Sequence, residues 1–384
     1  MILIWLFRTF FSLWLLLTLG VWRSTRRLPK LKASTLESYP PLTVLIPAAN
    51  EQESIKTTIQ RLLTCNYPDL KIIAVNDRST DETGSILNRL AEENNRLEVI
   101  HIEKLPDGWM GKVHALNTAW QRVTSPWFLV CDADVSFAPD SLKQAVQHAM
   151  AHDLDHLSLV PQLGAKSKPA QWVLDNFSMM GVAGIPFDHR GRVGGPGFGI
   201  GAFQLIKSDF FKRCPGFPAI QLEVIDDIAL GQMIYRSGGH SGIANGASQV
   251  SLTWYANWRT IILGLEKNLF AAATGYRIWP ILPIVLAACL FLISPVAVWA
   301  LGSPIDQGCV FGGMGLHFLG LAIAARHMKV KPRHALASPF ALATFLLAFC
   351  HSSWVVLCMG GVRWRGTFYP LSQLRKQRDA KRSA

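Results

Sequence analysis

The segment PWFLVCDADV, residues 126–135, indicates the fold class of this 384-residue chain. An apolar run ends in Asp132 and Asp134, with only Ala133 between them. Two residues apart on an extended strand lie on the same face, so both carboxylates are expected to point into one crevice. Because close carboxylates repel each other, such a pair favours a nearby divalent cation, or else an acid and a base that act together on a substrate.

Similar apolar runs recur at intervals along residues 40–165. Short strands are predicted at 42–47, 71–77, 97–102, 126–134 and 156–163, and helical patterns lie between several of them. This alternation predicts an α/β fold with a parallel sheet and helices on both faces. Ligands of such sheets bind beyond the carboxyl ends of the strands. The polar residues expected at that edge are Asn50 and Glu51, Asp77, and Asp132 and Asp134.

The pattern is less regular after residue 165. The stretch GRVGGPGFGIG, residues 191–201, predicts a mobile loop beside a site, and a plain surface loop is the alternative. Residues 223–238 have the apolar spacing of a helix, with Asp226 and Asp227 in or just before its first turn. The helix dipole favours acidic residues at that position, so a capping role is the alternative to a catalytic one.

The two ends of the chain are strongly apolar. Half of all residues are hydrophobic and 17% are charged, below the roughly 25% of an average soluble domain. Four segments reach about the length of a membrane-spanning helix: 1–22, 278–301, 307–325 and 335–362. A buried helix is the alternative for the third segment, which contains five glycines. Residues 254–277 are amphipathic and aromatic, which predicts a helix lying in the membrane interface.

The formal net charge of +12 comes largely from basic clusters beside the apolar segments. These clusters follow the first segment (residues 23–32), the third (326–333) and the fourth (363–382). Their placement agrees with the positive-inside rule and predicts a bilayer, not nucleic acid, as the partner. It places the central part of the chain in the cytoplasm. Seven cysteines without a CxxC pair agree with a reducing compartment.

Five motifs occur in a characteristic order: PAANE (47–51), VNDRSTDET (75–83), GWMGK (108–112), CDADV (131–135) and EVIDD (223–227). With them, the chain resembles the family 2 glycosyltransferases of the GT-A fold, an α/β fold with a Rossmann-like, mostly parallel sheet. It is most similar to membrane-bound members that glycosylate carotenoids, hopanoid-associated lipids and ceramide. The resemblance covers about residues 40–275, and the tail motif RWRGTFY (363–369) is similar to the carotenoid-type ending.

The resemblance implies a role for each motif. Pro47, Asn50 and Glu51 of PAANE, together with Asp77, would line the nucleotide-sugar pocket, and Asp132 would face the ribose or diphosphate. Lys112 would neutralise phosphate charge, and Asp134 would bind Mg2+ or Mn2+ at the diphosphate. Asp227 would be the general base. Asp226 replaces the glutamate that is usual beside it, so either of the two can be the base.

The implied activity is an inverting transfer of a sugar from a nucleotide-diphosphate sugar, preferentially a UDP-sugar, to the hydroxyl of a lipophilic acceptor. The acceptor would be a carotenoid, a hopanoid or a sphingolipid. The Gln-x-x-Arg-Trp motif of processive synthases is absent from WYANW (254–258), and GLEKN (264–268) resembles carotenoid-type enzymes instead. A polyprenyl-phosphate sugar transferase, a polysaccharide synthase and a non-catalytic membrane scaffold with a degenerate nucleotide-binding domain are the alternatives.

The expected organisation has six parts. A membrane helix (1–22) and a basic linker (23–39) precede the catalytic domain (40–253) and the interface helix (254–277). Membrane helices (278–362) and a basic cytoplasmic tail (363–384) follow. A full crossing by residues 335–362 would put the basic tail outside, against the positive-inside rule. Pro339 and His351 therefore favour a re-entrant or broken hairpin over a single crossing there.

Overall fold

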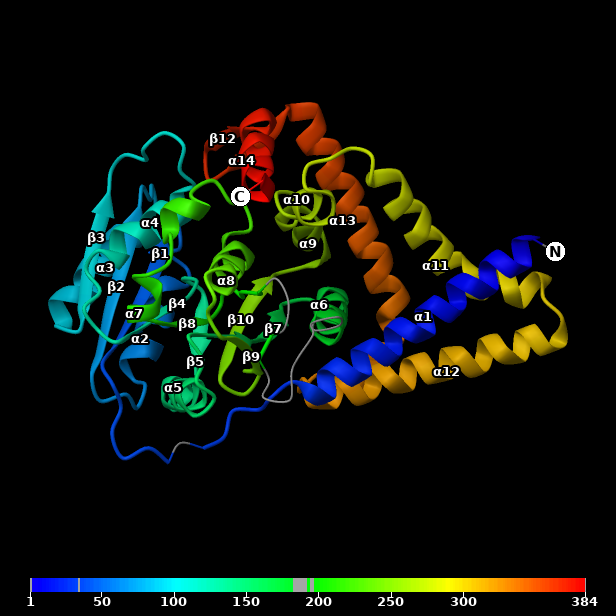
Figure 1. Cartoon of the computed structure of the whole chain (residues 1–384), viewed down its shortest axis with the longest axis horizontal. Coiled ribbons are helices and arrows are strands. Elements are labelled where there is room, and N and C mark those ends of the chain that lie inside the picture. The colour runs from blue at the N-terminus through cyan, green and yellow to red at the C-terminus, as the bar shows by residue number, and fades with distance from the viewer. Residues whose placement is uncertain (1, 34, 182–191, 194–196, 384) are drawn as a thin grey trace. The chain divides into compact units, whose positions relative to one another are not determined.

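The computed structural model describes residues 2–33, 35–181, 192–193 and 197–383, drawn in Figure 1. The chain divides into two compact units. One comprises Leu28–Gln162 and Pro186–Thr253, and the other comprises Met1–Arg27, Leu163–Ile185 and Trp254–Ala384. We call them the sheet unit and the helical unit.

A seven-stranded sheet organises the sheet unit. Its order is β3-β2-β1-β4-β8-β6-β9. The members are β1 (Leu42–Ala48), β2 (Leu70–Asp77), β3 (Leu97–Ile102), β4 (Trp127–Val130), β6 (His156–Val160), β8 (Gln204–Lys207) and β9 (Ser241–Asn245). Neighbouring strands are parallel, except that β8 runs antiparallel to both β4 and β6. The predicted α/β fold with a mostly parallel sheet is confirmed.

The strands of this sheet alternate with helices, as the hydrophobic spacing predicts. The helices are α2 (Ile55–Leu63), α3 (Thr83–Glu93), α4 (Gly111–Trp120), α5 (Ser141–Ala151), α7 (Ser208–Phe211) and α8 (Asp226–Arg236), with a 3-10 turn at η1 (Phe217–Ile220). In α2, Ile55, Ile59 and Leu62 are buried one turn apart, so this short helix is held by packing on the sheet. Two short strands, β5 (Val135–Phe137) and β10 (Val250–Tyr255), pair antiparallel.

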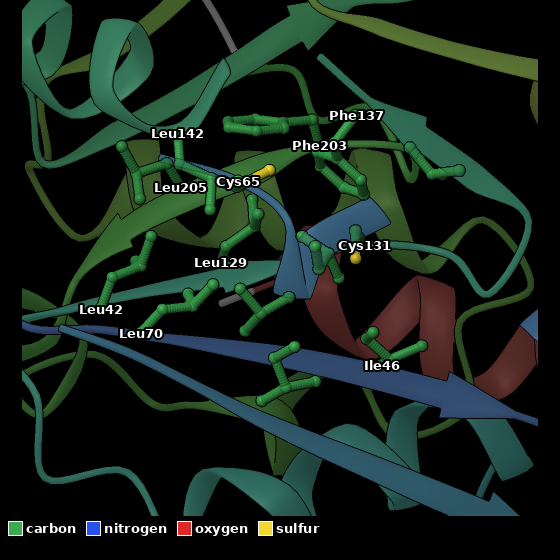
Figure 2. Packing of buried hydrophobic residues seen from close by; sticks show 14 of the residues in the cluster. Leu42, Ile46, Cys65, Leu70, Leu129, Cys131, Phe137, Leu142, Phe203 and Leu205 are labelled. Carbon is green, nitrogen blue, oxygen red and sulfur yellow. The ribbon is translucent and has the colours of Figure 1, made fainter. Parts of the chain in front are cut away.

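The core of the sheet unit is continuous and apolar (Figure 2). β1 and β4 are buried along their whole length, which explains why both read as unbroken apolar runs. Cys65 and Cys131 lie in this core. Burial raises the pKa of the Cys65 thiol to about 11, and burial together with nearby carboxylates raises the pKa of the Cys131 thiol well above its usual value.

The helical unit contains the long apolar helices. Its elements are α1 (Ile2–Arg27), α6 (Lys168–Gly181), α9 (Trp258–Gly264), α10 (Leu269–Thr274), α11 (Ile281–Leu301), α12 (Pro304–His327), η2 (Pro332–Ala337), α13 (Ser338–Met359), β11 (Gly361–Trp364), β12 (Thr367–Pro370) and α14 (Leu371–Ser383). β7 (Gln162–Ala165) leads into α6. Four helical segments are long and apolar enough to cross a membrane: Ile4–Arg27, Ile281–Leu301, Pro304–His327 and Pro332–Met359.

The glycines of α12 have a packing role. A Cβ at Gly313 would lie 2.4 Å from the Phe11 ring, and a Cβ at Gly320 would lie 2.7 Å from the Thr18 side chain. Small residues thus let α1 approach α12 closely, as in many apolar helix pairs. His317 on the same helix shares hydrogen bonds with Thr18 of α1 and Ser338 of α13, at 2.5 and 2.9 Å.

Residues 254–277 do not form the single interface helix that was expected. The end of β10, then α9 and then α10 occupy this range. Ser352 of α13 explains the break, because its hydroxyl donates to the carbonyl of Glu266 and accepts the Phe270 N–H. The Ser352 hydroxyl therefore replaces the i to i+4 hydrogen bond between the Glu266 carbonyl and the Phe270 N–H, which would have made α9 and α10 one helix.

Residues 338–359 form one unbroken helix, so the expected hairpin or break within 335–362 is wrong. Pro339 does not interrupt α13 because it lies in the first turn, where no helical N–H partner is lost. After α13 the tail is also ordered, as the β11–β12 hairpin and α14. Arg378 donates to the Ala271 carbonyl and Arg375 to the Tyr276 carbonyl, so the tail packs beside the end of α10.

Candidate active site

The carboxyl end of β4 leads directly into the two aspartates. The strand ends at Val130, so Asp132 and Asp134 lie in the turn between β4 and β5 rather than on a strand, as was expected. Thr58 of α2 anchors this turn by donating to the Ala133 carbonyl at 2.9 Å. Burial, followed by the charges of Asp132 and Glu51, raises the pKa of Asp134 to about 7. The turn therefore carries negative charge that no positive group within the turn neutralises.

Lys112 connects this turn to another part of the chain. It lies in the first turn of α4, and its ammonium is 2.7 Å from Asp132 Oδ1 and 3.0 Å from Asp226 Oδ2. Burial alone would lower the Lys112 pKa, but the carboxylates of Asp132, Asp226 and Asp227 raise it. One lysine thus bridges the turn after β4 and the first turn of α8.

Asp227 is oriented by two backbone amides. Its carboxylate accepts the N–H of Gly201 at 3.0 Å and the N–H of Ile228 at 2.8 Å. Burial and the neighbouring charge of Asp226 raise its pKa to about 6. A carboxylate with such a pKa, held in one orientation, is suited to act as a general base near neutral pH.

Two glycines of the 191–201 stretch approach this cluster, although most of the preceding part lies outside the described residues. A Cβ at Gly199 would lie 1.9 Å from the Asp227 carbonyl oxygen, and one at Gly201 would lie 2.8 Å from Asp132 Oδ2. A larger side chain at position 199 or 201 would clash with Asp227 or Asp132, so the loop can pass this close to them only with glycine at both positions. Gly199 and Gly201 therefore lie beside Asp227 and Asp132, and the expected position of this loop next to a functional site stays a prediction. Nothing in the sequence except the glycine content indicated this close fit.

Asp77 ends β2 and is almost fully buried, with 3% of its surface exposed. Its carboxylate accepts two hydrogen bonds from Arg78, at 2.7 and 3.0 Å. A Cβ at Gly111 would lie 2.3 Å from Asp77 Oδ2, which explains the glycine beside Lys112. His114 of α4 was not predicted from the sequence. Its Nδ1 is buried and has no hydrogen-bond partner among the described residues.

The PAANE segment forms the end of β1 and the loop after it. Pro47 pairs with Val75 of β2, beyond the last residue of β1 that pairs with β4, so its missing N–H leaves no gap in that ladder. Asn50 adopts a φ of 57°, and its side chain accepts the Thr80 N–H at 2.8 Å. Glu51 donates its N–H to Thr83 at 2.8 Å. These contacts tie the loop after β1 to the loop after β2.

The donor set around Asp134 fits a hard divalent cation bound together with a ligand. Asp132, Asp134 and Glu51 supply carboxylate oxygens, and burial followed by their mutual repulsion raises the Asp134 pKa. Within the ranges that the structure describes, no three acidic, histidine or cysteine side chains form a ready-made metal cage. A cation at Asp134 would therefore take further oxygen ligands from water or from a bound phosphate, as Mg2+ commonly does.

The predicted residues thus fall into two groups. Lys112, Asp132, Asp226 and Asp227 meet directly or through Gly201, and Asp134 and Glu51 adjoin them electrostatically. Asn50 and Asp77 are bound to their own loop neighbours, Thr80 and Arg78. The individual roles of these residues stay predictions.

Comparisons with known proteins relate the chain to glycosyltransferases. Residues 43–213 match the model of the family described as "Glycosyl transferase family 2". "Probable glycosyltransferase YdaM" of Bacillus subtilis (strain 168) is 36% identical over 111 residues, which is 28% of this chain and 26% of that protein. "4,4'-diaponeurosporenoate glycosyltransferase" of Staphylococcus aureus (strain bovine RF122 / ET3-1) is 25% identical over 281 residues, 71% of this chain and 70% of that protein.

A solved structure shares the fold. It is a mannosyltransferase of Pyrobaculum calidifontis in complex with GDP-Man and Mn2+, with a TM-score of 0.58 and 20% identity over 92% of this chain and 98% of that one. The mostly parallel seven-stranded sheet with its antiparallel β8 is that of the GT-A fold. More specifically, residues 43–213, a little under half of the chain, match the family 2 glycosyltransferase model.

Proposed function

We propose that the protein transfers a sugar, with inversion, from a nucleotide-diphosphate sugar to the hydroxyl of a lipophilic acceptor. The observation that carries this proposal is the cluster in which Lys112 bridges Asp132 and Asp226 next to Asp227. The Lys112 ammonium and the buried Asp227 carboxylate, with its raised pKa, supply the two functions that such a transfer needs. These are charge stabilisation of a leaving diphosphate and removal of a proton from the acceptor.

Asp227 is the proposed general base. Its orientation by Gly201 and Ile228 leaves carboxylate lone pairs for an acceptor hydroxyl, and the hydroxyl oxygen then attacks the anomeric carbon on the face opposite the nucleotide. Asp226 is a weaker candidate because Lys112 holds its Oδ2 at 3.0 Å. We therefore assign proton transfer to Asp227 and the positioning of Lys112 to Asp226.

The donor is proposed to bind along the edge formed by the loops after β1, β2 and β4. When the donor binds, a diphosphate oxygen would replace one aspartate as a partner of the Lys112 ammonium. Asp132 would then face the ribose or diphosphate. Pro47, Asn50, Glu51 and Asp77 would line the nucleotide end, where UDP is the expected carrier. The buried, unpartnered Nδ1 of His114 gives that end a further hydrogen-bonding group.

Asp134 is the proposed ligand of Mg2+ or Mn2+, with Asp132 and Glu51 close enough to affect its charge. When bound, the metal would supply positive charge where negative charge grows on the departing diphosphate. The Pyrobaculum mannosyltransferase was solved with Mn2+ and GDP-Man, which supports a divalent metal and a nucleotide sugar for the same fold.

A lipid acceptor is supported by the helical unit and by one relative. Four segments could span a bilayer, and the Staphylococcus relative is named for the glycosylation of 4,4'-diaponeurosporenoate. A carotenoid, a hopanoid or a sphingolipid is therefore the proposed acceptor class. An integral protein of the cytoplasmic membrane, with its catalytic domain in the cytoplasm, fits the basic clusters.

α13 is proposed to lie along the membrane surface rather than to cross it. η2 before it is bound to α6 through Asn176 and His334, and Ser352 near its end is bound to the turn between α9 and α10. α6 and α9 follow β7 and β10 after only a few residues. Both ends of α13 are therefore held by short elements of the helical unit, and with α13 along the surface a cytoplasmic tail needs no fourth crossing.

One assay tests the proposed transfer. Membranes containing the full chain would be incubated with UDP- and GDP-sugars, Mn2+ or Mg2+, and fractionated lipid acceptors. We expect a glycosylated lipid from wild type and far less of it from Asp134→Ala or Asp227→Asn. Product formation at the wild-type rate by either purified variant would contradict the assignment, and a growing polysaccharide instead of a single addition would favour a synthase.

A further inference from the structure

A second cluster of charge lies at the ends of two apolar helices in the helical unit. Seven exposed cations occur there, and we call them the basic rim: Arg23, Arg26, Arg27, Arg326, Lys329, Lys331 and Arg333. The first three are in the last turns of α1, and the others lie at the end of α12 and up to η2. They belong to none of the contacts described for the candidate active site.

The packing of α1 on α12 brings the two groups to the same level. Phe11 lies against Gly313, Thr18 against His317 and Gly320, and Val21 joins a buried cluster with Leu321 and Ala325. The residue numbers rise together along both helices, so the helices run parallel and end side by side. Figure 1 shows α1 and α12 next to each other in this way.

Among the described residues, no carboxylate forms an ion pair with the basic rim. Residues 1–36 and 307–378 contain no aspartate or glutamate. Over the described ranges, none of the seven cations forms an ion pair. Helix dipoles explain cations in the last turns, such as Arg27 and Arg326. They do not explain Lys331 and Arg333, which lie beyond the end of α12.

Lys329 is in a conformation that does not favour lysine. Its φ is 55°, and the next N–H, of Val330, bonds back to the Ala325 carbonyl at 2.9 Å. This is the αL termination of a helix, at a position where glycine is usual. A side chain that costs stability at such a position points to a role for its charge rather than for the fold.

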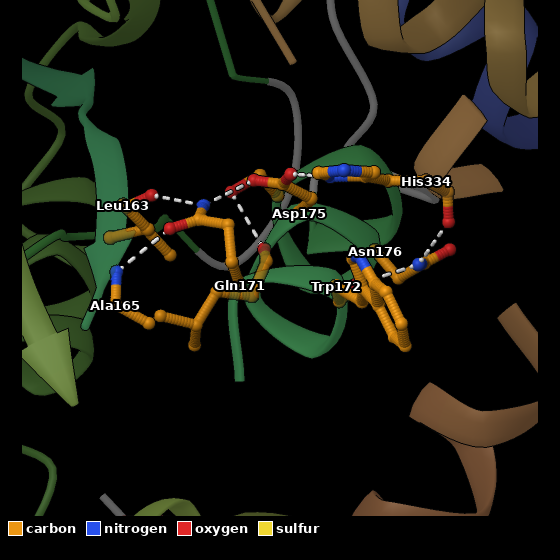
Figure 3. Close-up of polar contacts among 9 residues, drawn as sticks. Leu163, Ala165, Gln171, Trp172, Asp175, Asn176 and His334 are labelled. Carbon is orange, nitrogen blue, oxygen red and sulfur yellow. Dashed lines mark hydrogen bonds and ion pairs between the residues drawn. The ribbon is translucent and has the colours of Figure 1, made fainter. Parts of the chain in front are cut away.

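η2 is held by a buried polar network, shown in Figure 3. Asp175 of α6 is 2.5 Å from the Nδ1 of His334, and Asn176 donates to the His334 carbonyl at 2.9 Å. Gln171 donates to the other oxygen of Asp175 at 2.7 Å. Because His334 is fixed inward, its neighbours Lys331 and Arg333 are held at the surface.

We propose that the basic rim is a binding site for the phosphate group of an anionic phospholipid. One arginine guanidinium can donate two parallel hydrogen bonds to a phosphate group, and the lysines add positive charge beside it. Apolar helices end at the same level, so a lipid could place its chains along α1 and α12 and its phosphate at the rim. This inference rests on the proposed membrane embedding, and it does not depend on the sugar-transfer activity.

Lipid binding to the purified full-length protein in detergent tests the proposal. Native mass spectrometry and thermal unfolding would be recorded with phosphatidylglycerol, with phosphatidylcholine and with glycerol phosphate as a soluble phosphate. We expect retention and stabilisation by phosphatidylglycerol only. Each removed cation should weaken its binding roughly fivefold, so Lys331→Gln/Arg333→Gln should weaken it about 25-fold. Lys329→Gly should unfold at a higher temperature than wild type yet bind the lipid less well.

A matched control removes two exposed cations elsewhere. Lys56→Gln/Arg61→Gln changes the same charge on α2, and its lipid binding should equal that of wild type. Equal phosphatidylglycerol binding by wild type and by the Lys331/Arg333 variant would overturn the proposal. So would equal binding of phosphatidylcholine, or binding of glycerol phosphate with the same strength, because the latter would define a soluble-phosphate site.

Discussion

The carboxylate of Asp227 is held by the backbone N–H of Gly201 at 3.0 Å, although the two residues lie in different elements of the sheet unit. A Cβ at position 201 would lie 2.8 Å from Asp132 Oδ2 and 3.5 Å from Asp227 Oδ2. Gly201→Ala should therefore displace both carboxylates. We expect sugar transfer to fall about 100-fold, as small displacements of catalytic groups do, with little change in thermal unfolding.

Gly312→Ala is the matched control for this substitution. No atom lies within 4 Å of a Cβ at Gly312, which is inside α12. Alanine should increase helix stability there by up to about 1 kcal/mol and leave transfer unchanged. Equal activity of the Gly201 and Gly312 variants would mean that the fit of Gly201 to the two aspartates has no part in the reaction.

The raised pKa of Asp227 predicts the acid limb of the pH profile. A base must be ionised to accept a proton, so kcat/KM should fall as the pH decreases through about 6. Asp227→Asn should lower the rate by 10²–10⁴-fold, the usual contribution of a general base. Asp226→Asn is the comparison. A larger loss of kcat in that variant than in Asp227→Asn would assign the base to Asp226 instead.

Asp134 predicts how stability depends on pH and metal. Its pKa is about 7 in the folded chain and near 4 when unfolded, so the folded state keeps a proton that the unfolded state has lost. Stability should therefore fall as the pH rises from 4 to 7. Mn2+ should restore the midpoint of thermal unfolding more at pH 8 than at pH 5.

Asp134→Asn should lose much of this pH dependence and of the Mn2+ effect. Asp107→Asn, which alters an exposed acid, should keep both. The measurement is the unfolding midpoint at several pH values, with and without Mn2+. An undiminished Mn2+ effect in Asp134→Asn would place the metal elsewhere.

Lys267 and Trp364 join two motifs that lie far apart in the sequence. The Lys267 ammonium is 3.3 Å from the centroid of the Trp364 ring, so GLEKN contacts RWRGTFY. A double-mutant cycle with Lys267→Met and Trp364→Leu should give a coupling of about 0.5–2 kcal/mol in unfolding. A coupling near zero would mean that the contact adds nothing to the attachment of the tail.

The position of α13 predicts the side on which the tail lies. If α13 follows the membrane surface, α14 is cytoplasmic. A thiol introduced by Ser372→Cys, in the exposed first turn of α14, should then be labelled by an impermeant reagent only after the membrane is opened. Labelling of intact cells at that position would require α13 to cross the bilayer.

Periodic, local features of the fold could be predicted from the sequence. β1, β2, β3 and β4 follow apolar runs, and Glu51 after β1 lies near Asp132 and Asp134 after β4. β8 and β9 escaped prediction because QLIK and SGIAN are too short and too polar to show a strand period. Their position in the sheet depends on pairing with β6.

The long-range contacts of the site and of the helical unit could not be predicted. Nothing near Lys112 in the sequence indicates that it reaches Asp226, more than a hundred residues away. The break between α9 and α10 depends on Ser352, which is 82 residues from Phe270 in the sequence. Residue types predicted candidate site residues where these are neighbours in the sequence, as Asp132 and Asp134 are. Geometry between distant residues required the folded chain.

The buried thiols of Cys65 and Cys131 have a practical consequence. Alkylating reagents attack thiolates, and both residues hold their protons at physiological pH because their pKa values are raised by burial. Cys131 directly precedes Asp132, yet it should stay unmodified in the native protein. Cysteine-scanning variants of the sheet unit can therefore keep both residues. Once the other five cysteines, of which Cys309, Cys350 and Cys358 are exposed, have been replaced, inactivation by a maleimide can be attributed to the introduced thiol.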